Sequence, residues 1–542
     1  MHAEPETYSA SIDDLAAREE AATSMPERIT LFDDNGQRKA QSTVLTEIGQ
    51  QHHLFHNPDS EAFARVTVAN HAEVFRVAGS EYRDLLGRTY YLLSGSGANR
   101  NAITDAVATL TATARYAGPE EPVHLRVGAT DSGIVMDTGA SDWAVIEVDT
   151  SGWRIVRQHA VNFRRTTKAT ALPVAGHADF GLIWKYINVE VADRVLVAAW
   201  LLAALRPHGP FPILLLLGEQ GTGKSNSSRT LKSLTDPSGV PLRPPPRDDR
   251  DLLVAALNSW VLALDNLSGA TPQLSDALCR LATGGALAGR KLYTDSEESA
   301  HNIQRPVILN GIDDLASRPD LAERCIHLTL PTLTTRTTEA ELAGQFKVDA
   351  PKIMAALLDG VVLALRDVAT VNIGVLPRMA DFAKWAAAGV PALGFTAEAF
   401  ITAYRRNQAD AVALGLESST VACTIRSFAE RHGRWKGTAR ELLSRLNQEA
   451  EADRNMPGWP HSPKGLQTIL RRLAPSLRSI GIHVERDRNA EGRYLTLSCQ
   501  PRGQVSQVSQ LTPAPVSNDG MTHMTLPREP STVAPTPEAF DL

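Results

Sequence analysis

The stretch from Ile213 to Ser225 constrains this chain more than any other part of it. It consists of five apolar residues followed by the pattern GxxxxGKS. The apolar run predicts a buried strand and the residues after Ser225 predict a helix, so the glycines lie in a loop whose backbone N–H groups can surround a phosphate. In such a loop the lysine reaches phosphate oxygens and the serine hydroxyl binds Mg²⁺. The sequence therefore predicts a site for ATP and Mg²⁺, and the residues expected to contact the nucleotide are Gly218, Glu219, Gln220, Gly221, Thr222, Gly223, Lys224, Ser225 and Asn226.

Two apolar strands further along the chain end in polar residues that can complete this site. Residues 260–264 are apolar and are followed by Asp265, which we expect to hold Mg²⁺ together with Ser225. Residues 306–309 form a second apolar run, followed by Asn310, whose amide can orient the water that attacks the terminal phosphate. Taken alone, Asp265 would be a solvated acid after a core strand and Asn310 a turn residue.

Length and composition narrow the class of protein. A chain of 542 residues is too long for one core and predicts about three or four domains. The net charge of -6 means that a nucleic-acid surface has to be local. The 4 cysteines contain no CxxC pair, which argues against a zinc site or a disulfide framework and favours a reducing cytoplasm. The most apolar segment, Val195 to Leu205, is too short to span a bilayer, so we expect a cytoplasmic protein that does not enter a membrane.

Changes in sequence texture divide the chain into six parts. Short alternating runs between Phe63 and Arg157, with one helical stretch, predict a small mixed α/β domain before the phosphate loop. After the loop region, helical periodicity predicts a lid packed on an ATPase core. We therefore expect an α/β protein with these parts: a mobile N-terminal segment at 1–58, the small mixed α/β domain at 59–175, a P-loop ATPase core at 176–335, a helical lid at 336–432, a winged-helix domain at 433–500 and a disordered tail at 501–542.

The expected winged helix is basic. It has two amphipathic helices followed by two extended segments, which is the helix–helix–hairpin order of that fold. From Arg434 to Thr496 there are 12 Lys and Arg against 7 Asp and Glu, a local charge of +5 in an acidic chain. This unit is predicted to bind DNA, and Arg471, Arg472 and Arg488 are its candidate contacts.

The order of these motifs resembles superfamily 3 helicases, a branch of the AAA+ ATPases. The phosphate loop, the strand with Asp265 and the strand with Asn310 are similar to the A, B and C motifs of that family. Between B and C the family carries a glycine-containing turn with basic residues, and residues 281–293 look like it. The resemblance implies that Arg290 and Lys291 face a central pore and grip DNA; the alternative is a solvated surface hairpin. Residues from Phe63 to about Leu497 also resemble uncharacterised ATP-binding proteins of bacterial chromosomes and mobile elements.

The resemblance also implies a ring, with a hexamer as the expected form. AAA+ enzymes complete each site with an arginine of the neighbouring subunit, and Arg324, just before an apolar strand, is in the usual place for it, with Arg318 as second choice. The alternative is a surface arginine paired with Asp320 or Glu323. Arg378, at the start of a lid helix, resembles the sensor 2 arginine that touches the terminal phosphate.

One departure from the family leaves two functions open. Most AAA+ proteins follow the Mg²⁺-binding aspartate with a carboxylate that activates water, whereas Asn266 stands there in this chain. An amide can position water but cannot take its proton. The first function is an ATP-dependent DNA helicase or translocase of a phage, plasmid or other mobile element. The second is an ATP-binding switch with slow hydrolysis that controls assembly of a DNA-binding or defence complex.

Overall fold

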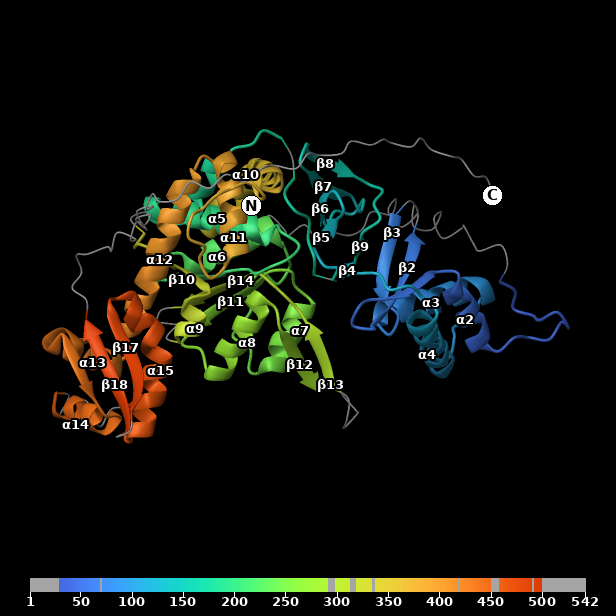
Figure 1. Ribbon diagram of the computed structural model, residues 1–542. Helices are drawn as coiled ribbons and strands as arrows, with labels where there is room; N and C mark the ends of the chain where they lie inside the picture. Colours follow the sequence, from blue (N-terminus) through green and yellow to red (C-terminus); the bar gives the residue numbers. More distant parts are fainter. Residues whose placement is uncertain are drawn as a thin grey trace, which may run out of the picture. The chain divides into compact units, whose positions relative to one another are not determined.

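The computed structural model describes most of the chain up to Cys499 (Figure 1). The described ranges are 29–68, 71–166, 168–174, 176–290, 298–311, 318–333, 337–417, 419–449, 458–489 and 492–499. At residues 287–290, 298–300, 319, 488–489 and 492–493 the structure describes only the backbone. Residues Met1–Cys499 form one compact unit, and the expected tail at 501–542 lies outside the described residues. No helix in the described ranges combines the length and apolar character needed to cross a membrane.

The first part of the chain is a three-stranded antiparallel sheet packed on helices. Its core contains Leu45, Tyr82 and Leu110, one from each helix. Residues 41–56, which we expected in a mobile segment, form a helix and the first strand of this sheet. The elements are α2 (Gln41–Gln50), β1 (His53–His56), β2 (Ala62–Val68), β3 (His71–Arg76), α3 (Ser80–Ser94) and α4 (Arg100–Tyr116).

A second antiparallel sheet follows, so the expected small domain contains two main sheets. The strand order β5-β6-β7-β8 follows the chain, and β4 pairs in parallel with β9. The alternating runs seen in the sequence correspond to strands β2, β3, β7 and β8. The new elements are β4 (Val123–His124), β5 (Val127–Thr130), β6 (Gly133–Asp137), β7 (Val145–Asp149), β8 (Gly152–Val156) and β9 (Asn162–Phe163).

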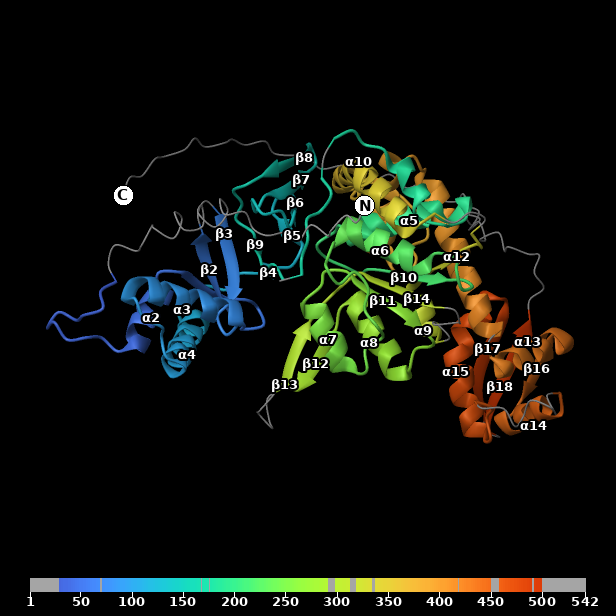
Figure 2. The same ribbon diagram turned by 180° about the vertical axis from the view of Figure 1, so that it is seen from behind.

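The phosphate loop belongs to a parallel sheet with the strand order β11-β14-β10-β15. Because side chains alternate across a strand, Leu214 and Leu216 enter the hydrophobic cluster on one face, while Ile213 and Leu215 enter the cluster on the other. Helices α5 and α6 cover the first face, and α7 and α8 cover the second (Figures 1 and 2). The strands are β10 (Ile213–Leu217), β11 (Leu262–Leu267), β14 (Val307–Gly311) and β15 (Cys325–Thr329). The helices are η1 (Phe180–Lys185), η2 (Val191–Asp193), α5 (Arg194–Ala204), α6 (Lys224–Thr235), α7 (Asp249–Leu257), α8 (Pro272–Thr283) and α9 (Pro319–Ala322).

An antiparallel hairpin interrupts the core between α8 and β14. Its strands are β12 (Ala286–Arg290) and β13 (Glu298–Asn302). The predicted basic turn thus falls in a hairpin whose second strand leads into β14. Lys291 lies outside the described residues, as does the rest of the connection 291–297.

The expected lid region is helical and shares the core of the first sheet face. Leu357 and Val361 of α10, and Phe382 of α11, join the cluster that contains Trp200 of α5. Thr338 begins α10 with a capping box completed by Glu341. The elements are α10 (Glu339–Asp367), α11 (Ala380–Gly389), η3 (Val390–Leu393) and α12 (Ala397–Glu417).

The last described part has its own hydrophobic core and a sheet of order β16-β18-β17. Phe428 of α13 and Leu416 at the end of α12 pack in this core with residues of α14 and α15, so α13, which precedes the expected boundary at 432, shares a core with the elements after it. The elements are α13 (Thr420–His432), β16 (Arg434–Gly437), α14 (Ala439–Glu449), α15 (Pro463–Ser479), β17 (Ile482–Asn489) and β18 (Gly492–Cys499). The two amphipathic helices and the hairpin predicted from the sequence are present in that order.

Candidate nucleotide-binding site

The phosphate loop joins the carboxyl end of β10 to the first turn of α6. Gly218, Gly221 and Gly223 have φ values of 144°, 85° and 87°, which side chains other than glycine rarely tolerate. At Gly218 a Cβ atom would also lie 2.9 Å from the carbonyl oxygen of Leu330. Gly223 is the N-cap of α6, so the free N–H groups and the positive end of the helix dipole face the loop. The backbone is therefore shaped to receive an anion.

Lys224 lies across this loop. Its Nζ donates hydrogen bonds to the carbonyl oxygens of Gly218 at 2.6 Å and Glu219 at 2.7 Å. Burial lowers the pKa of Lys224, while the nearby charge of Asp265 raises it. An ammonium group binds phosphate oxygens more strongly than backbone carbonyl oxygens. When a phosphate is bound, we therefore expect the Lys224 ammonium group to leave the carbonyls and donate to the phosphate.

Ser225 and Asp265 meet at the loop. The Ser225 hydroxyl donates a hydrogen bond of 2.8 Å to Oδ1 of Asp265. Asp265 is brought there by an irregularity in the sheet: Leu264 pairs with Leu309 and Leu267 pairs with Gly311, so two residues of β11 oppose one of β14. This is the count of a β-bulge, which turns the bulged side chains away from the regular alternation.

Asn310 is the single residue opposite the bulge, and it is almost completely buried. Its Oδ1 accepts the backbone N–H of Asn266 at 2.8 Å, and its Nδ2 donates to Oγ of Ser228 at 3.0 Å. Asn266 has φ of 58°, in the left-handed region that asparagine tolerates better than most residues. The Asn310 side chain thus ties the bulge on β11 to helix α6.

The other loop residues are held less tightly. Glu219 and Gln220 are exposed, and the Thr222 hydroxyl donates to the carbonyl of Glu219 at 3.0 Å. Asn226 reaches the carbonyl of Tyr186 only at 3.5 Å. Asn188 was missed by the sequence analysis: its Nδ2 donates to the carbonyl oxygens of Thr222 and Pro331 and fixes the loop from outside. No sequence motif marks Asn188, because it precedes the loop strand by a whole helix.

Arg324 and Arg378 lie together. Arg324 ion-pairs with Asp320 at 2.6 Å, and Arg378 pairs with both Asp320 and Glu323. The carbonyl of Arg324 accepts the N–H of Ile213, at the amino end of β10, whereas the phosphate loop begins at its carboxyl end. Five residues of strand span roughly 16 Å, so Arg324 lies about that distance from the phosphate loop. Arg378 shares Asp320 with Arg324 and therefore lies beside Arg324, away from the phosphate loop of the same chain.

The candidate DNA contacts fall in two places. Arg290 ends β12, where only the backbone is considered, and Lys291 is outside the described residues. Arg471 and Arg472 are exposed on α15, and Arg488 lies in β17, where again only the backbone is considered. The sequence-predicted residues thus form three groups: the nucleotide set at one sheet edge, the arginine pair at the other, and the basic residues of the hairpin and C-terminal part.

The residues at the loop fit a Mg²⁺-nucleotide. Ser225 and Asp265 offer a hydroxyl and a carboxylate oxygen to one point, and Mg²⁺ is commonly held by one or two such groups with phosphate oxygens and waters. Within the described ranges no group of three or more His, Cys, Asp or Glu could hold a metal by itself. The strand, loop and helix with these side chains at the carboxyl edge of a parallel sheet are compatible with a P-loop nucleotide-binding core.

Two family models match consecutive regions of this chain. Residues 182–412 match the actinomycete integrative conjugative element replication protein, and residues 421–513 match the C-terminal domain of that protein, AICE RepA. The first match ends within α12, and the second begins at the start of α13. The resemblance to proteins of mobile elements, inferred from the sequence, is confirmed.

Solved structures give a more distant likeness. One, described as an active SCCmec type IV Cch helicase, is 12% identical and has a TM-score of 0.45, covering 82% of this chain and 92% of that chain. Another, the apo C-terminal region of NrS-1 in its A form, is 11% identical with a TM-score of 0.39, covering 85% and 99%. No curated protein gives a significant match.

Proposed function

We propose that this protein is an ATP-dependent DNA translocase or helicase of superfamily 3 type that takes part in replicating a mobile element. The observation that carries the proposal is the meeting of Ser225, Asp265 and Asn310 at the phosphate loop. The match to a family of replication proteins supports the DNA-directed part.

In this proposal the chain's own residues bind ATP and orient its terminal phosphate. Lys224 leaves the carbonyls of Gly218 and Glu219 and neutralises phosphate oxygens. Ser225 and Asp265 would hold Mg²⁺, which would neutralise negative charge on the phosphates of ATP during phosphoryl transfer. Hydrogen bonds of Asn310 join the bulge of β11 to α6, so a displacement at the phosphates would move both β11 and α6.

The hairpin supplies a direct route from this site to DNA. Strand β13 leads through a short connection into β14, and Asn310 is the penultimate residue of β14. A shift of β14 when the terminal phosphate is lost would therefore move the hairpin that carries Arg290 and Lys291. Adjacent cations on a moving hairpin can hold and release a phosphodiester backbone.

The arginine pair supports assembly into a ring, for which a hexamer is the form we propose. Arg324 and Arg378 share Asp320 at the sheet edge away from the phosphate loop, so neither side chain serves its own subunit's nucleotide as it stands. In this proposal both arginines complete the site of a neighbouring subunit. This assignment moves Arg378 from a role within its own subunit to a role across the boundary.

We further propose that the part from α13 to β18 is a winged helix that binds DNA. Its elements have the required order, and Arg471 and Arg472 present two adjacent exposed cations on α15. Helices α10 to α12 would then be the lid that follows the ATPase core.

A second function, an ATP-dependent switch, is favoured by Asn266. This exposed amide follows Asp265 where a base is expected, and the Asn310 amide that was expected to orient water already has partners on both sides. Slow hydrolysis would suit a protein that holds one state for a long time.

Unwinding of forked DNA separates the two functions. In a motor, Arg290→Ala with Lys291→Ala leaves DNA-free ATP hydrolysis nearly unchanged but removes both its stimulation by single-stranded DNA and strand separation. The matched control is Arg83→Ala with Arg88→Ala, which removes the same charge from exposed positions on α3. Undiminished strand separation in the hairpin variant would contradict the role proposed for Arg290 and Lys291, and a wild-type protein that hydrolyses ATP without separating strands would favour the switch.

A further inference from the structure

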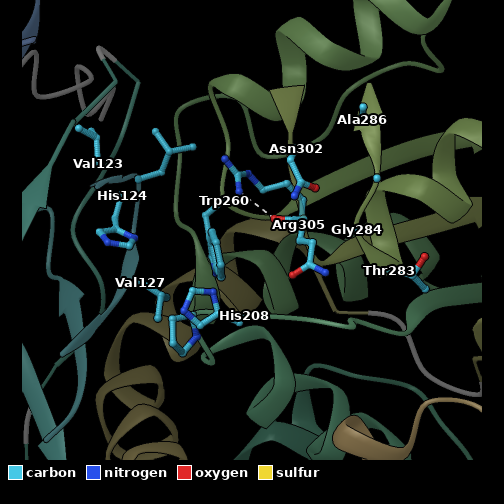
Figure 3. A pocket seen from close by; sticks show the side chains of 14 residues that line it. Val123, His124, Val127, His208, Trp260, Thr283, Gly284, Ala286, Asn302 and Arg305 are labelled. Atoms are coloured by element: carbon cyan, nitrogen blue, oxygen red, sulfur yellow. Dashed lines mark hydrogen bonds between the residues drawn. The ribbon is translucent and has the colours of Figure 1, made fainter. Parts of the chain in front are cut away.

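A cavity lies at the base of the hairpin, away from the phosphate loop. Its volume is about 750 Å³, within the range of sites that enclose a small ligand or part of a larger one. Residues at both ends of the hairpin line it, Gly284 and Asn302 among them. Figure 3 shows these two and Arg305 on one side of the cavity, His124 on the other, and Trp260 and His208 between them. Trp260 precedes β11 and Arg305 precedes β14, so the cavity is at the amino ends of the strands.

The lining is basic and polar. Among the described residues no Asp or Glu lines the cavity, although the chain as a whole has more acidic than basic residues. His124, His208 and Arg305 all face it, together with the amides of Asn302 and Gln304. This composition suits an anion and is unfavourable for a cation.

Arg305 is a partly buried cation with no carboxylate partner among the described residues. Its Nε donates to the carbonyl oxygens of Ala256 and Ser259, and its Nη1 donates to that of Gln304. Within the described residues it makes no ion pair. Burial lowers its pKa to about 10, and the carboxylate that opposes this effect, Asp236, is already paired with Lys232. A buried charge without a counter-ion is costly, so an anion bound beside the guanidinium would be strongly favoured.

Two histidines also line the cavity. Burial, followed by the positive charges of His208 and Arg305, lowers the pKa of His124 to about 4, so this imidazole is neutral near pH 7 and offers a hydrogen bond without a charge. His208 is exposed and marks the side from which a ligand can enter.

The cavity walls are fixed before any ligand arrives. One wall of the cavity contains Leu125 and Val127. Arg126, between them, is buried and donates hydrogen bonds to Asp236 and to the carbonyl of Pro237, so this wall is held to the end of α6. Gln304 accepts the N–H of Gly209 at 2.9 Å. Gly284 has a φ of 90°, in the left-handed region that favours glycine, where the chain enters the hairpin.

We propose that this cavity binds a phosphodiester group of single-stranded DNA next to the hairpin, with Arg305 and His208 contacting the phosphate and the adjoining nucleotide filling the remaining space. The inference rests on the proposed DNA translocase function and adds a second contact for the strand. A DNA strand is favoured over a free nucleotide because both ends of the hairpin that would grip DNA line the cavity. Strand binding here would link the position of the hairpin to the wall carried by β4 and β5.

Protection of His208 from chemical modification tests the site in the full-length protein. Diethyl pyrocarbonate acylates accessible neutral imidazoles, and mass spectrometry of the digested protein reports the fraction of His208 that has reacted. We expect a thymidine oligonucleotide to protect His208 at concentrations that saturate binding, and to leave His177, an exposed histidine outside the cavity, reactive. Thymidine monophosphate and inorganic pyrophosphate are the competing probes.

Affinity measurements with variants complete the test. His208→Glu should weaken oligonucleotide binding about tenfold and leave DNA-free ATP hydrolysis unchanged, because it places a negative charge beside the phosphate. His177→Glu makes the same change of charge elsewhere and should alter neither quantity. Arg305→Lys keeps the positive charge but removes the forked guanidinium group. It should weaken oligonucleotide binding although, unlike His208→Glu, it introduces no negative charge.

The outcomes separate this inference from the proposed function. If wild-type protein binds and is stimulated by single-stranded DNA, but His208 stays reactive and His208→Glu binds normally, the cavity assignment is wrong and the translocase function stands. Protection by the mononucleotide or pyrophosphate alone would overturn the DNA assignment in favour of a free anion. If wild-type protein does not bind single-stranded DNA, the proposed function and this inference fail together.

Discussion

Asn266 offers a quantitative test of the hydrolytic site. The residue follows Asp265 in the bulge of β11, its side chain is exposed, and its N–H is held by Oδ1 of Asn310. Asn266→Glu would place a carboxylate where related ATPases carry their base. Because the backbone position is fixed by Asn310, the new side chain starts from a defined direction, and we expect it to activate water.

The expected magnitude combines a gain in catalysis and a cost in stability. A positioned general base contributes about 10² to 10⁴ in rate, which corresponds to roughly 3 to 5 kcal/mol of activation free energy. The φ of 58° at this position is tolerated by asparagine, whereas glutamate in the left-handed region costs about 1 kcal/mol in folding free energy. That strain is present in both the ground state and the transition state, so it lowers stability and not kcat.

Asn266→Gln is the matched control, because it has the same length and backbone strain without a base. Steady-state release of phosphate at saturating ATP should give a kcat for Asn266→Glu that is at least about tenfold above that of Asn266→Gln. Equal rates for the two variants would refute the idea that a missing base limits hydrolysis. A rate below wild type in both would show that the native amide has its own role at the bulge.

Three further predictions address the loop, the subunit boundary and the C-terminal part. Lys224→Ala should abolish ATP hydrolysis and weaken ATP binding, measured by phosphate release and by a fluorescent ATP analogue, since no neighbouring side chain can replace its charge; unchanged rates would remove the site assignment. Arg324→Ala protein mixed with Asp265→Ala protein should recover activity at hybrid interfaces, and wild-type activity should rise with protein concentration; a monomer with concentration-independent turnover argues against a ring. Removing residues 420–542 should lower DNA affinity, measured by anisotropy, and leave basal hydrolysis intact, and full-length binding should fall steeply with salt; binding that ignores salt would indicate a protein partner.

Several elements were predictable because their information is local. The alternating runs predicted between Phe63 and Arg157 include β2 and β8, and the helical stretch predicted among them is α4. These segments are periodic over their own length, which is what sequence patterns record. The extent of the N-terminal part was not predictable in this way, because α2 is held by packing on α3 and α4, far along the chain.

At the candidate nucleotide site, the strand, loop and helix around Lys224 could be predicted from local patterns, as could the approach of Asp265 and Asn310, because polar residues that end apolar strands in a parallel sheet gather at one edge. The strand order could not: β14 lies between β10 and β11, so that Asn310 faces a bulge containing Asp265 and Asn266. The tertiary structure also decided that Arg378 joins Arg324 on the opposite edge, and that His124 and Arg305 meet across one cavity. Strand order, and contacts between residues far apart in the sequence, depend on burying both faces of the sheet at the same time. A pattern within one short segment does not contain that information.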